Sequence, residues 1–124
     1  MPDFNQVTVP LADYDASVAF YRALGLKQIV AAAPRYARFE SSSGSTFSIE
    51  AAEEIAGPIF YFECADLDAV IARLRADGVA VSDPRDEDWG WREARLIDPA
   101  GNAICLYQAG ENRRFPPWRL ADDA

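Results

Sequence analysis

The sequence predicts an α+β fold of two βαβββ modules related by pseudo-twofold symmetry, with curved mixed sheets around a cleft and the helices outside. Three observations support this prediction: a segment that is repeated along the chain, alternating apolar residues before each copy, and three strand-like runs after each copy. With 124 residues, 50% of them hydrophobic, the chain is long enough for a single domain with a substantial core. We expect module one at residues 1–56, module two at residues 57–110 and a C-terminal arm at residues 111–124.

The repeat relates residues 12–26 to residues 65–79. Identical residues occupy matching positions: Ala12, Asp13, Asp15, Ala16, Ala19, Arg22, Ala23 and Gly25 match Ala65, Asp66, Asp68, Ala69, Ala72, Arg75, Ala76 and Gly78. Each copy predicts a helix, because an aspartate stands at the N-cap position and a glycine follows the last turn. One apolar stripe at helical spacing should be buried on each helix: Tyr14, Val18 and Tyr21, and Leu67, Ile71 and Leu74.

A strand is expected before each helix, at residues 6–11 and 59–63. Alternate side chains of a strand point to opposite faces, so the apolar set of each strand should pack against the helices. The opposite face, which should line the cleft, then carries Gln6, Thr8, Ile59 and Tyr61. Shorter strands are predicted after the helices, at Lys27–Val30, Tyr36–Glu40, Thr46–Glu50, Val79–Ser82, Arg92–Ile97 and Ala103–Tyr107.

The composition excludes several classes of function. A formal net charge of −8 argues against a nucleic-acid-binding protein, since phosphate recognition needs clustered lysine and arginine. The absence of histidine excludes an imidazole base and removes the commonest ligand of zinc and iron. The sequence shows no membrane span and no signal-peptide pattern. Two cysteines without CxxC spacing, Cys64 and Cys105, favour a reduced, cytoplasmic protein.

Aromatic and acidic residues indicate a binding site for a small organic molecule. Trp89 and Trp91 follow an acidic loop, and aromatic rings beside carboxylates suit a flat or cationic ligand. In an apolar cleft, the pKa of Glu50 would rise toward the range useful for proton transfer; on the surface, Glu50 would be an ordinary strand-end glutamate. Cys105 is interpreted as a small buried residue. A nucleophilic thiolate needs a cationic neighbour, and the chain has no histidine to provide one.

Two stretches of the chain carry a resemblance to a known family. The first contains Val7-Thr8-Val9-Pro10, Asp13, Ser17, Phe20-Tyr21 and Leu24-Gly25, and the second contains Trp89-Gly90-Trp91-Arg92 and Asp98-Pro99-Ala100-Gly101-Asn102 before the strand Ala103–Tyr107. Over residues 4–108 the chain resembles the vicinal oxygen chelate superfamily, the group of glyoxalases, bleomycin-resistance proteins and extradiol dioxygenases. The resemblance implies a homodimer, and it covers isomerases, dioxygenases, lyases and metal-free drug-binding proteins.

The resemblance also implies where a metal would be held: one ligand on the first strand and one on the last strand of each module. The matching positions in this chain are Gln6, Glu50, Ile59 and Cys105. An isoleucine offers no donor atom, and a neutral amide is an unusual member of a set of three. We therefore predict no metal and no other cofactor.

The predicted function is metal-independent binding of a small aromatic or cationic organic molecule, of the drug-sequestering type that confers antibiotic resistance. The predicted ligand-binding residues are Gln6, Thr8, Glu50, Tyr61, Trp89, Trp91, Cys105 and Tyr107. The alternative is a glyoxalase-like lyase or isomerase, or a dioxygenase-like enzyme, with Glu50 as catalytic base or metal ligand. A purely structural domain is a third alternative and predicts a filled cleft. The arm is expected to close over the cleft, to clasp a second subunit or to be a loosely held terminus.

Overall fold

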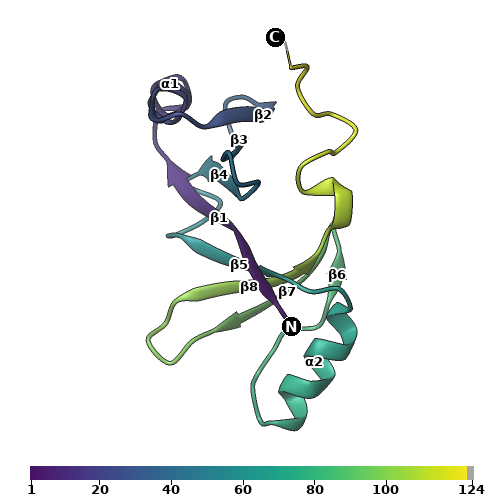
Figure 1. Cartoon of the computed structure of the whole chain (residues 1–124). Coiled ribbons are helices and arrows are strands. Elements are labelled where there is room, and N and C mark those ends of the chain that lie inside the picture. The colour runs from purple at the N-terminus through teal and green to yellow at the C-terminus, as the bar shows by residue number, and fades with distance from the viewer. Residues whose placement is uncertain (123–124) are drawn as a thin grey trace.

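One mixed sheet of eight strands, with two helices outside it, forms the fold in the computed structural model, which describes residues 1–122. The strand order is β2-β3-β4-β1-β5-β8-β7-β6, and the sheet curves so that its two ends reach the same side of the molecule (Figure 1). The C-terminal arm lies on that side (Figure 1). Residues 123 and 124 of the expected arm lie outside the described residues.

Each half of the chain has the order strand, helix, three strands, which confirms the predicted fold class. The first half supplies β1 (Asp3–Leu11), α1 (Tyr14–Leu24), β2 (Lys27–Ala32), β3 (Tyr36–Glu40) and β4 (Thr46–Ala51). The second half supplies β5 (Ile59–Glu63), α2 (Leu67–Ala76), β6 (Arg85–Asp86), β7 (Arg92–Ile97) and β8 (Ala103–Gln108). A short 3-10 helix, η1 (Gly110–Asn112), leads into the arm.

The two halves meet in the centre of the sheet. Strands β1 and β5 run antiparallel there, with Val7 paired to Phe60. Each of these strands also pairs in parallel with the last strand of its own half, β1 with β4 and β5 with β8. The same pairing on both sides of the centre gives the sheet its pseudo-twofold symmetry.

Both helices begin where the repeat predicts, and the expected glycine follows each of them, Gly25 after α1 and Gly78 after α2. The side chains of Asp13 and Asp66 accept hydrogen bonds from the backbone amides of Ala16 (3.0 Å) and Ala69 (3.1 Å), as N-cap residues do. Gly25 ends α1 with φ of 110°, in the left-handed region that favours glycine. Within residues 1–122, no helix combines the length and the apolar character needed to cross a membrane.

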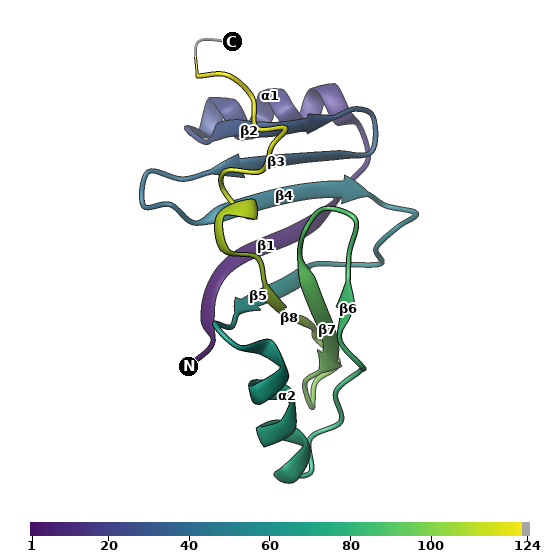
Figure 2. The same cartoon turned by 90° about the vertical axis from the view of Figure 1, so that its right-hand side faces the viewer.

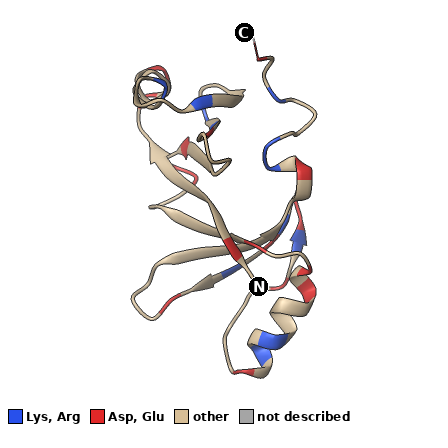
Figure 3. Ribbon diagram, in the orientation of Figure 1, with Lys and Arg blue, Asp and Glu red and all other residues tan. Residues whose placement is uncertain are grey.

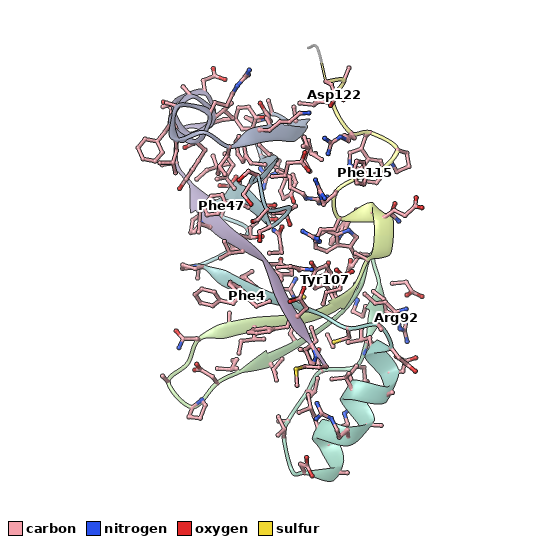
Figure 4. All side chains as sticks on the ribbon, in the orientation of Figure 1. Phe4, Phe47, Arg92, Tyr107, Phe115 and Asp122 are labelled. Atoms are coloured by element: carbon pink, nitrogen blue, oxygen red, sulfur yellow. The ribbon has the colours of Figure 1, made fainter. Side chains whose placement is uncertain are left out.

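The helices cover two separate parts of the outer face of the sheet. Helix α1 packs on a cluster that contains Leu11, Phe39 and Ile49, and Phe47 lies on the same side (Figure 4). Helix α2 packs on a second cluster, formed by Cys64, Leu67, Ile71, Ala94 and Leu106. The apolar sets of the strands therefore face the helices as predicted, and the alternate residues of each strand lie on the inner face.

The prediction of a strand at Val79–Ser82 is wrong. The first strand after α2 is the two-residue β6, and residues 79–82 are irregular. The backbone amide of Ser82 donates to the carbonyl oxygen of Arg95 (2.9 Å), but the Arg95 amide donates to the Ser82 hydroxyl (2.7 Å) rather than to a backbone oxygen. The Ser82 hydroxyl thus accepts the hydrogen bond that a backbone oxygen would accept in a β-ladder. Pro84 has no N–H with which to extend such a ladder. The other short strands are confirmed, with small differences at their ends.

Candidate functional site

A cavity of about 590 Å³ lies between the inner face of the sheet and the arm. Its wall contains five aromatic side chains, Tyr36, Tyr61, Trp89, Trp91 and Trp118. The same wall contains five charged side chains, Arg35, Arg38, Glu50, Glu54 and Glu93. In Figure 2 the arm crosses in front of β2, β3 and β4, and Trp118 of the arm contributes to the wall of the cavity. The volume suits a small organic molecule.

Five of the eight predicted ligand-binding residues line this cavity: Thr8, Glu50, Tyr61, Trp89 and Trp91. The other three, Gln6, Cys105 and Tyr107, do not line it, because they are buried beneath the inner face. Tyr107, which is labelled in Figure 4, donates a hydrogen bond to the side chain of Asn5 under the cavity. The role of the lining residues in ligand binding stays a prediction.

A chain of hydrogen-bonded polar side chains runs beneath the cavity. Nε2 of Gln6 donates to Oγ of Ser48 (2.9 Å) and to Oγ1 of Thr8 (3.1 Å). Oγ of Ser48 lies 2.7 Å from the Tyr36 hydroxyl, which accepts a hydrogen bond from Nε of Arg38 (2.8 Å). These contacts fix the orientation of Tyr36 and Arg38 at the cavity wall.

The strand pairing corrects the expected match between Glu50 and Cys105. In the parallel pairs, Thr8 lies beside Ser48, and Tyr61 lies beside Cys105. Thr8 and Tyr61 occupy equivalent positions of the two halves, so the counterpart of Cys105 is Ser48. Glu50 stands one inward-facing position further along β4.

The corrected set of expected ligand positions does not suit a metal ion. Ile59 supplies no donor atom, and Gln6 offers only a neutral amide oxygen, Oε1, which is buried without a hydrogen-bond partner. Cys105 is fully buried, and burial together with the nearby Glu93 carboxylate raises the pKa of its thiol. A raised thiol pKa opposes the thiolate that a metal site or a nucleophile needs. Among residues 1–122, no three or more His, Cys, Asp or Glu side chains converge into a potential metal site.

The tryptophans contribute to the wall in two different ways. Trp91 is only 3% exposed, and its ring stacks on Tyr107 with 4.7 Å between ring centroids. Trp89 and Trp118 are more exposed, and Nε1 of Trp89 donates to the Glu93 carboxylate (2.9 Å). Trp91 is therefore part of the core as well as of the wall, whereas Trp89 and Trp118 have room to adjust to a ligand.

Glu50 differs from the other carboxylates of the wall, because no described residue forms an ion pair or a hydrogen bond with its carboxylate. Glu54 pairs with Arg35, and Glu93 pairs with Arg95 (2.7 Å). Burial raises the pKa of Glu50, and the Glu54 carboxylate raises it further against the opposing charge of Arg95. The cavity thus presents a half-buried carboxylate whose charge is unpaired.

The arm is docked firmly onto the molecule. Arg114 and Arg119 both bind the carboxylate of Glu40, at 3.0 and 2.8 Å. The backbone amide of Leu120 donates to the carbonyl oxygen of Ile29 (2.8 Å). Figure 3 shows the basic segments of the arm in blue. Of the three alternatives for the arm, this docked position matches closure over the cleft.

The inner-face residues of β3 and β7 were not among the predicted site residues. Tyr36 and Arg38 alternate with residues such as Phe39 that face α1, and Glu93 occupies the equivalent face of β7. The same period of two that identified Thr8 and Tyr61 would have found them. Trp118 was a candidate as one of three tryptophans suited to ligand binding, but it was not placed in the predicted site, because the arm has no periodic pattern.

The fold and the cavity define a class of protein in which two βαβββ modules share one curved sheet. A family model described as Glyoxalase/Bleomycin resistance protein/Dioxygenase superfamily matches residues 3–106. The chain therefore belongs to this superfamily, which confirms the family expected from the sequence. No curated protein shows significant sequence similarity to the chain.

Three solved structures are similar to this chain at low sequence identity. Methylmalonyl-CoA epimerase from Mycobacterium tuberculosis is 21% identical with a TM-score of 0.70, and the match covers 86% of this chain and 87% of the epimerase. A superfamily member from Vibrio splendidus 12B01 is 14% identical with a TM-score of 0.68, over 87% of this chain and 99% of its own. A Legionella pneumophila structure described as NAD-dependent benzaldehyde dehydrogenase is 20% identical with a TM-score of 0.68, over 85% and 98%. At these identities the likeness shows the fold alone.

Proposed function

We propose that this protein binds a small cationic aromatic molecule in the cavity without a metal ion. The observation that carries the proposal is the unpaired carboxylate of Glu50 in a wall that also holds Trp89, Trp91 and Trp118. A half-buried carboxylate without a counter-ion is costly, and an organic cation supplies the missing charge. The faces of the aromatic rings attract the same cation through their quadrupoles.

The donor set supports binding without a metal ion. Of the four ligand positions corrected by the strand register, two hold Ile59 and the neutral amide of Gln6, and a third holds the neutral hydroxyl of Ser48. The fourth position holds the buried thiol of Cys105. Zinc takes three or four strong donors and hard cations take several oxygens, so this set suits neither.

Exchange of Glu50 for glutamine tests the proposal, because it removes the charge and keeps the shape. The probe is benzyltrimethylammonium, a permanent aromatic cation, and the neutral control ligand is N,N-dimethylbenzamide, both measured by titration calorimetry. We expect Glu50→Gln to weaken binding of the cation by about tenfold or more and to leave the neutral amide unchanged. Glu53→Gln, at an exposed glutamate paired with Arg35, is the matched control and should bind like the wild type. A wild type that does not bind the cation contradicts the proposal.

Binding of the cation should depend on pH through Glu50. Burial and the Glu54 carboxylate raise the pKa of Glu50 in the free protein, and a bound cation favours the ionised form and lowers that pKa again. Affinity is therefore full above the raised pKa and falls as the pH drops through it, by up to about tenfold per pH unit. Calorimetric titrations at a series of pH values measure this fall. Glu50→Gln should not show it, and a wild-type affinity that is the same at about pH 7 and about pH 4 would exclude this role.

The same glutamate favours one alternative function, that of a lyase or isomerase in which Glu50 is the general base. A carboxylate with a raised pKa in a cavity is suited to accept a proton from a substrate. Glu50→Gln separates the two functions: an enzyme would lose turnover of a test substrate such as a hemithioacetal while it still binds the substrate. A binding protein would show no turnover before or after the exchange.

We extend the proposal to a drug-sequestering role in antibiotic resistance, with the protein acting as a cytoplasmic homodimer. A cavity wall with an unpaired carboxylate and several aromatic rings suits cationic aromatic antibiotics of the bleomycin type. Two exposed apolar side chains one turn apart on α1, Phe20 and Leu24, support association with a second copy. Both cysteines are free and buried, which is compatible with a reducing compartment.

A further inference from the structure

The charges in the cavity wall fall into a paired group and an unpaired group. Arg35 pairs with Glu54, and Glu93 pairs with a neighbouring arginine. Two charges remain, the carboxylate of Glu50 and the guanidinium of Arg38, and neither forms an ion pair with any of residues 1–122. We propose that Arg38 binds a carboxylate of the ligand, so that the ligand is an aromatic zwitterion. The cationic group of this ligand is the one that Glu50 binds in the proposed function, and to that extent the inference rests on the proposed function.

Arg38 is a buried cation without a counter-ion. It stands in the middle of β3, and 3% of its surface is exposed. Its Nε donates to the Tyr36 hydroxyl (2.8 Å), and its Nη1 donates to the carbonyl oxygens of Asn112 (3.3 Å) and Arg113 (3.0 Å). Its guanidinium carbon lies 4.7 Å from the centroid of the Trp91 ring. All of these partner groups are neutral, so the positive charge is solvated by dipoles and not neutralised.

One nitrogen of Arg38 keeps its hydrogen-bonding capacity. No described residue accepts a hydrogen bond from Nη2, and Arg38 lines the cavity. Among residues 1–122, Oε1 of Gln6 is the one side-chain nitrogen or oxygen that is both fully buried and without a hydrogen-bond partner. Because Nη2 of Arg38 also has no partner, it is not fully buried. Guanidinium donors form their strongest hydrogen bonds with carboxylates, and in a cavity these bonds compete with little water.

Arg38 and Glu50 stand at a spacing that suits the two ends of one ligand. In the β3–β4 pair, Arg38 lies beside Ser48 and Tyr36 lies beside Glu50. The backbone positions of the two charged residues are therefore on neighbouring strands and offset by two residues, about 7 Å along the strand direction. Both line the same cavity, as does Trp118 of the arm. An aromatic ring with one charge at each end matches this arrangement.

The charge of the whole protein favours a zwitterion over a simple anion. A net charge of −8 repels a free anion from the molecule, and Glu50 repels it inside the cavity. A carboxylate that is attached to a cation carries no net repulsion and satisfies both unpaired groups. Arg38 therefore selects, among aromatic cations, those that also carry a carboxylate.

The experiment compares ligands that differ by one charge. The probe 4-[(trimethylammonio)methyl]benzoate carries a cation and a carboxylate at opposite ends of one ring, and its methyl ester carries the cation alone. With the wild-type protein, calorimetry should show that the zwitterion binds about tenfold more tightly than the ester, or better. Equal affinities, or tighter binding of the ester, overturn the inference and leave the proposed function standing. Failure of both probes to bind overturns both proposals.

Two variants assign the carboxylate to Arg38. Arg38→Met keeps an unbranched, largely apolar stem and removes the charge, and Arg38→Lys keeps the charge. We expect Arg38→Met to lose the preference for the zwitterion while it retains the affinity for the ester, and Arg38→Lys to keep part of the preference. A purely structural arginine would change the affinity for both probes equally, and that result overturns the assignment. The comparison of probes on the wild type remains decisive if Arg38→Met does not fold.

Discussion

Replacement of Trp91 by alanine should lower the free energy of unfolding by about 3–5 kcal/mol, the largest effect expected in the cavity wall. The Trp91 ring is the bulkiest member of a buried cluster that also contains Ile59, Tyr61, Cys105 and Tyr107. Its removal leaves a void between β5, β7 and β8. Tyr107 cannot fill this void, because its hydroxyl is held by Asn5.

Polar partners of Trp91 add to this cost. Its Nε1 donates to the carbonyl oxygen of Asn112 (3.1 Å), and its ring lies under the guanidinium of Arg38. Urea unfolding followed by circular dichroism measures the effect, and Trp118→Ala, at a residue that is 46% exposed, is the control with an expected loss of about 1 kcal/mol or less. A similarly small loss for Trp91→Ala would contradict the packing described for this residue. Trp118→Ala is also the better test of aromatic contact with a ligand, because loss of Trp91 changes the core.

Local signals were sufficient to predict the helices and the inward-facing residues of the two central strands. Asp13 and Asp66 cap their helices through hydrogen bonds that span only three residues, so sequence alone identifies them. The alternation in β1 and β5 placed Thr8 and Tyr61 on the inner face. The family also follows from local motifs, because the residues that carry the resemblance lie in short stretches such as Val7–Pro10 and Asp98–Asn102.

Features that depend on pairing between distant segments could not be predicted in the same way. The match of Ser48 with Cys105 depends on the registers of two separate strand pairs, although equal spacing from the preceding turn glycines, Gly44 and Gly101, would have indicated it. The ion pair between Glu40 and Arg119 joins residues that are 79 positions apart, and no local pattern links them. The arm, and with it one side of the cavity, therefore remained an open alternative until the structure placed it.

Replacement of Glu40 by glutamine should free the arm and destabilise the protein by roughly 2–3 kcal/mol at neutral pH. The Glu40 carboxylate accepts hydrogen bonds from Nη2 of Arg119 (2.8 Å) and Nε of Arg114 (3.0 Å), and its side chain is 9% exposed. The two hydrogen bonds from Arg119, and then the one from Arg114, lower the pKa of Glu40 to about 2 against the opposing effect of burial. Glutamine keeps the shape of the side chain and leaves both guanidinium groups without a counter-charge.

The depressed pKa of Glu40 sets the pH range of this effect. The carboxyl titrates near 4.5 when unfolded and near 2 in the folded protein, so its contribution is complete above about pH 4.5 and is lost as the pH falls toward 2. The unfolding free energies of the wild type and Glu40→Gln should therefore differ at pH 7 and converge in acid. Glu53→Gln, at an exposed carboxylate, should change stability little at any pH. A wild-type advantage over Glu40→Gln that persists undiminished in acid would contradict the assignment.

Release of the arm has a readout that is separate from stability. Trypsin cleaves after arginine, and the bonds after Arg114 and Arg119 lie in the docked arm. Glu40→Gln should be cut at these bonds faster than the wild type under conditions in which the sheet stays folded. Because Trp118 lies between the two sites and lines the cavity, the freed arm should also weaken binding of the cationic probe. Cleavage that stays as slow as in the wild type would mean that the Arg113 contacts with the loop at Gly44 hold the arm without Glu40.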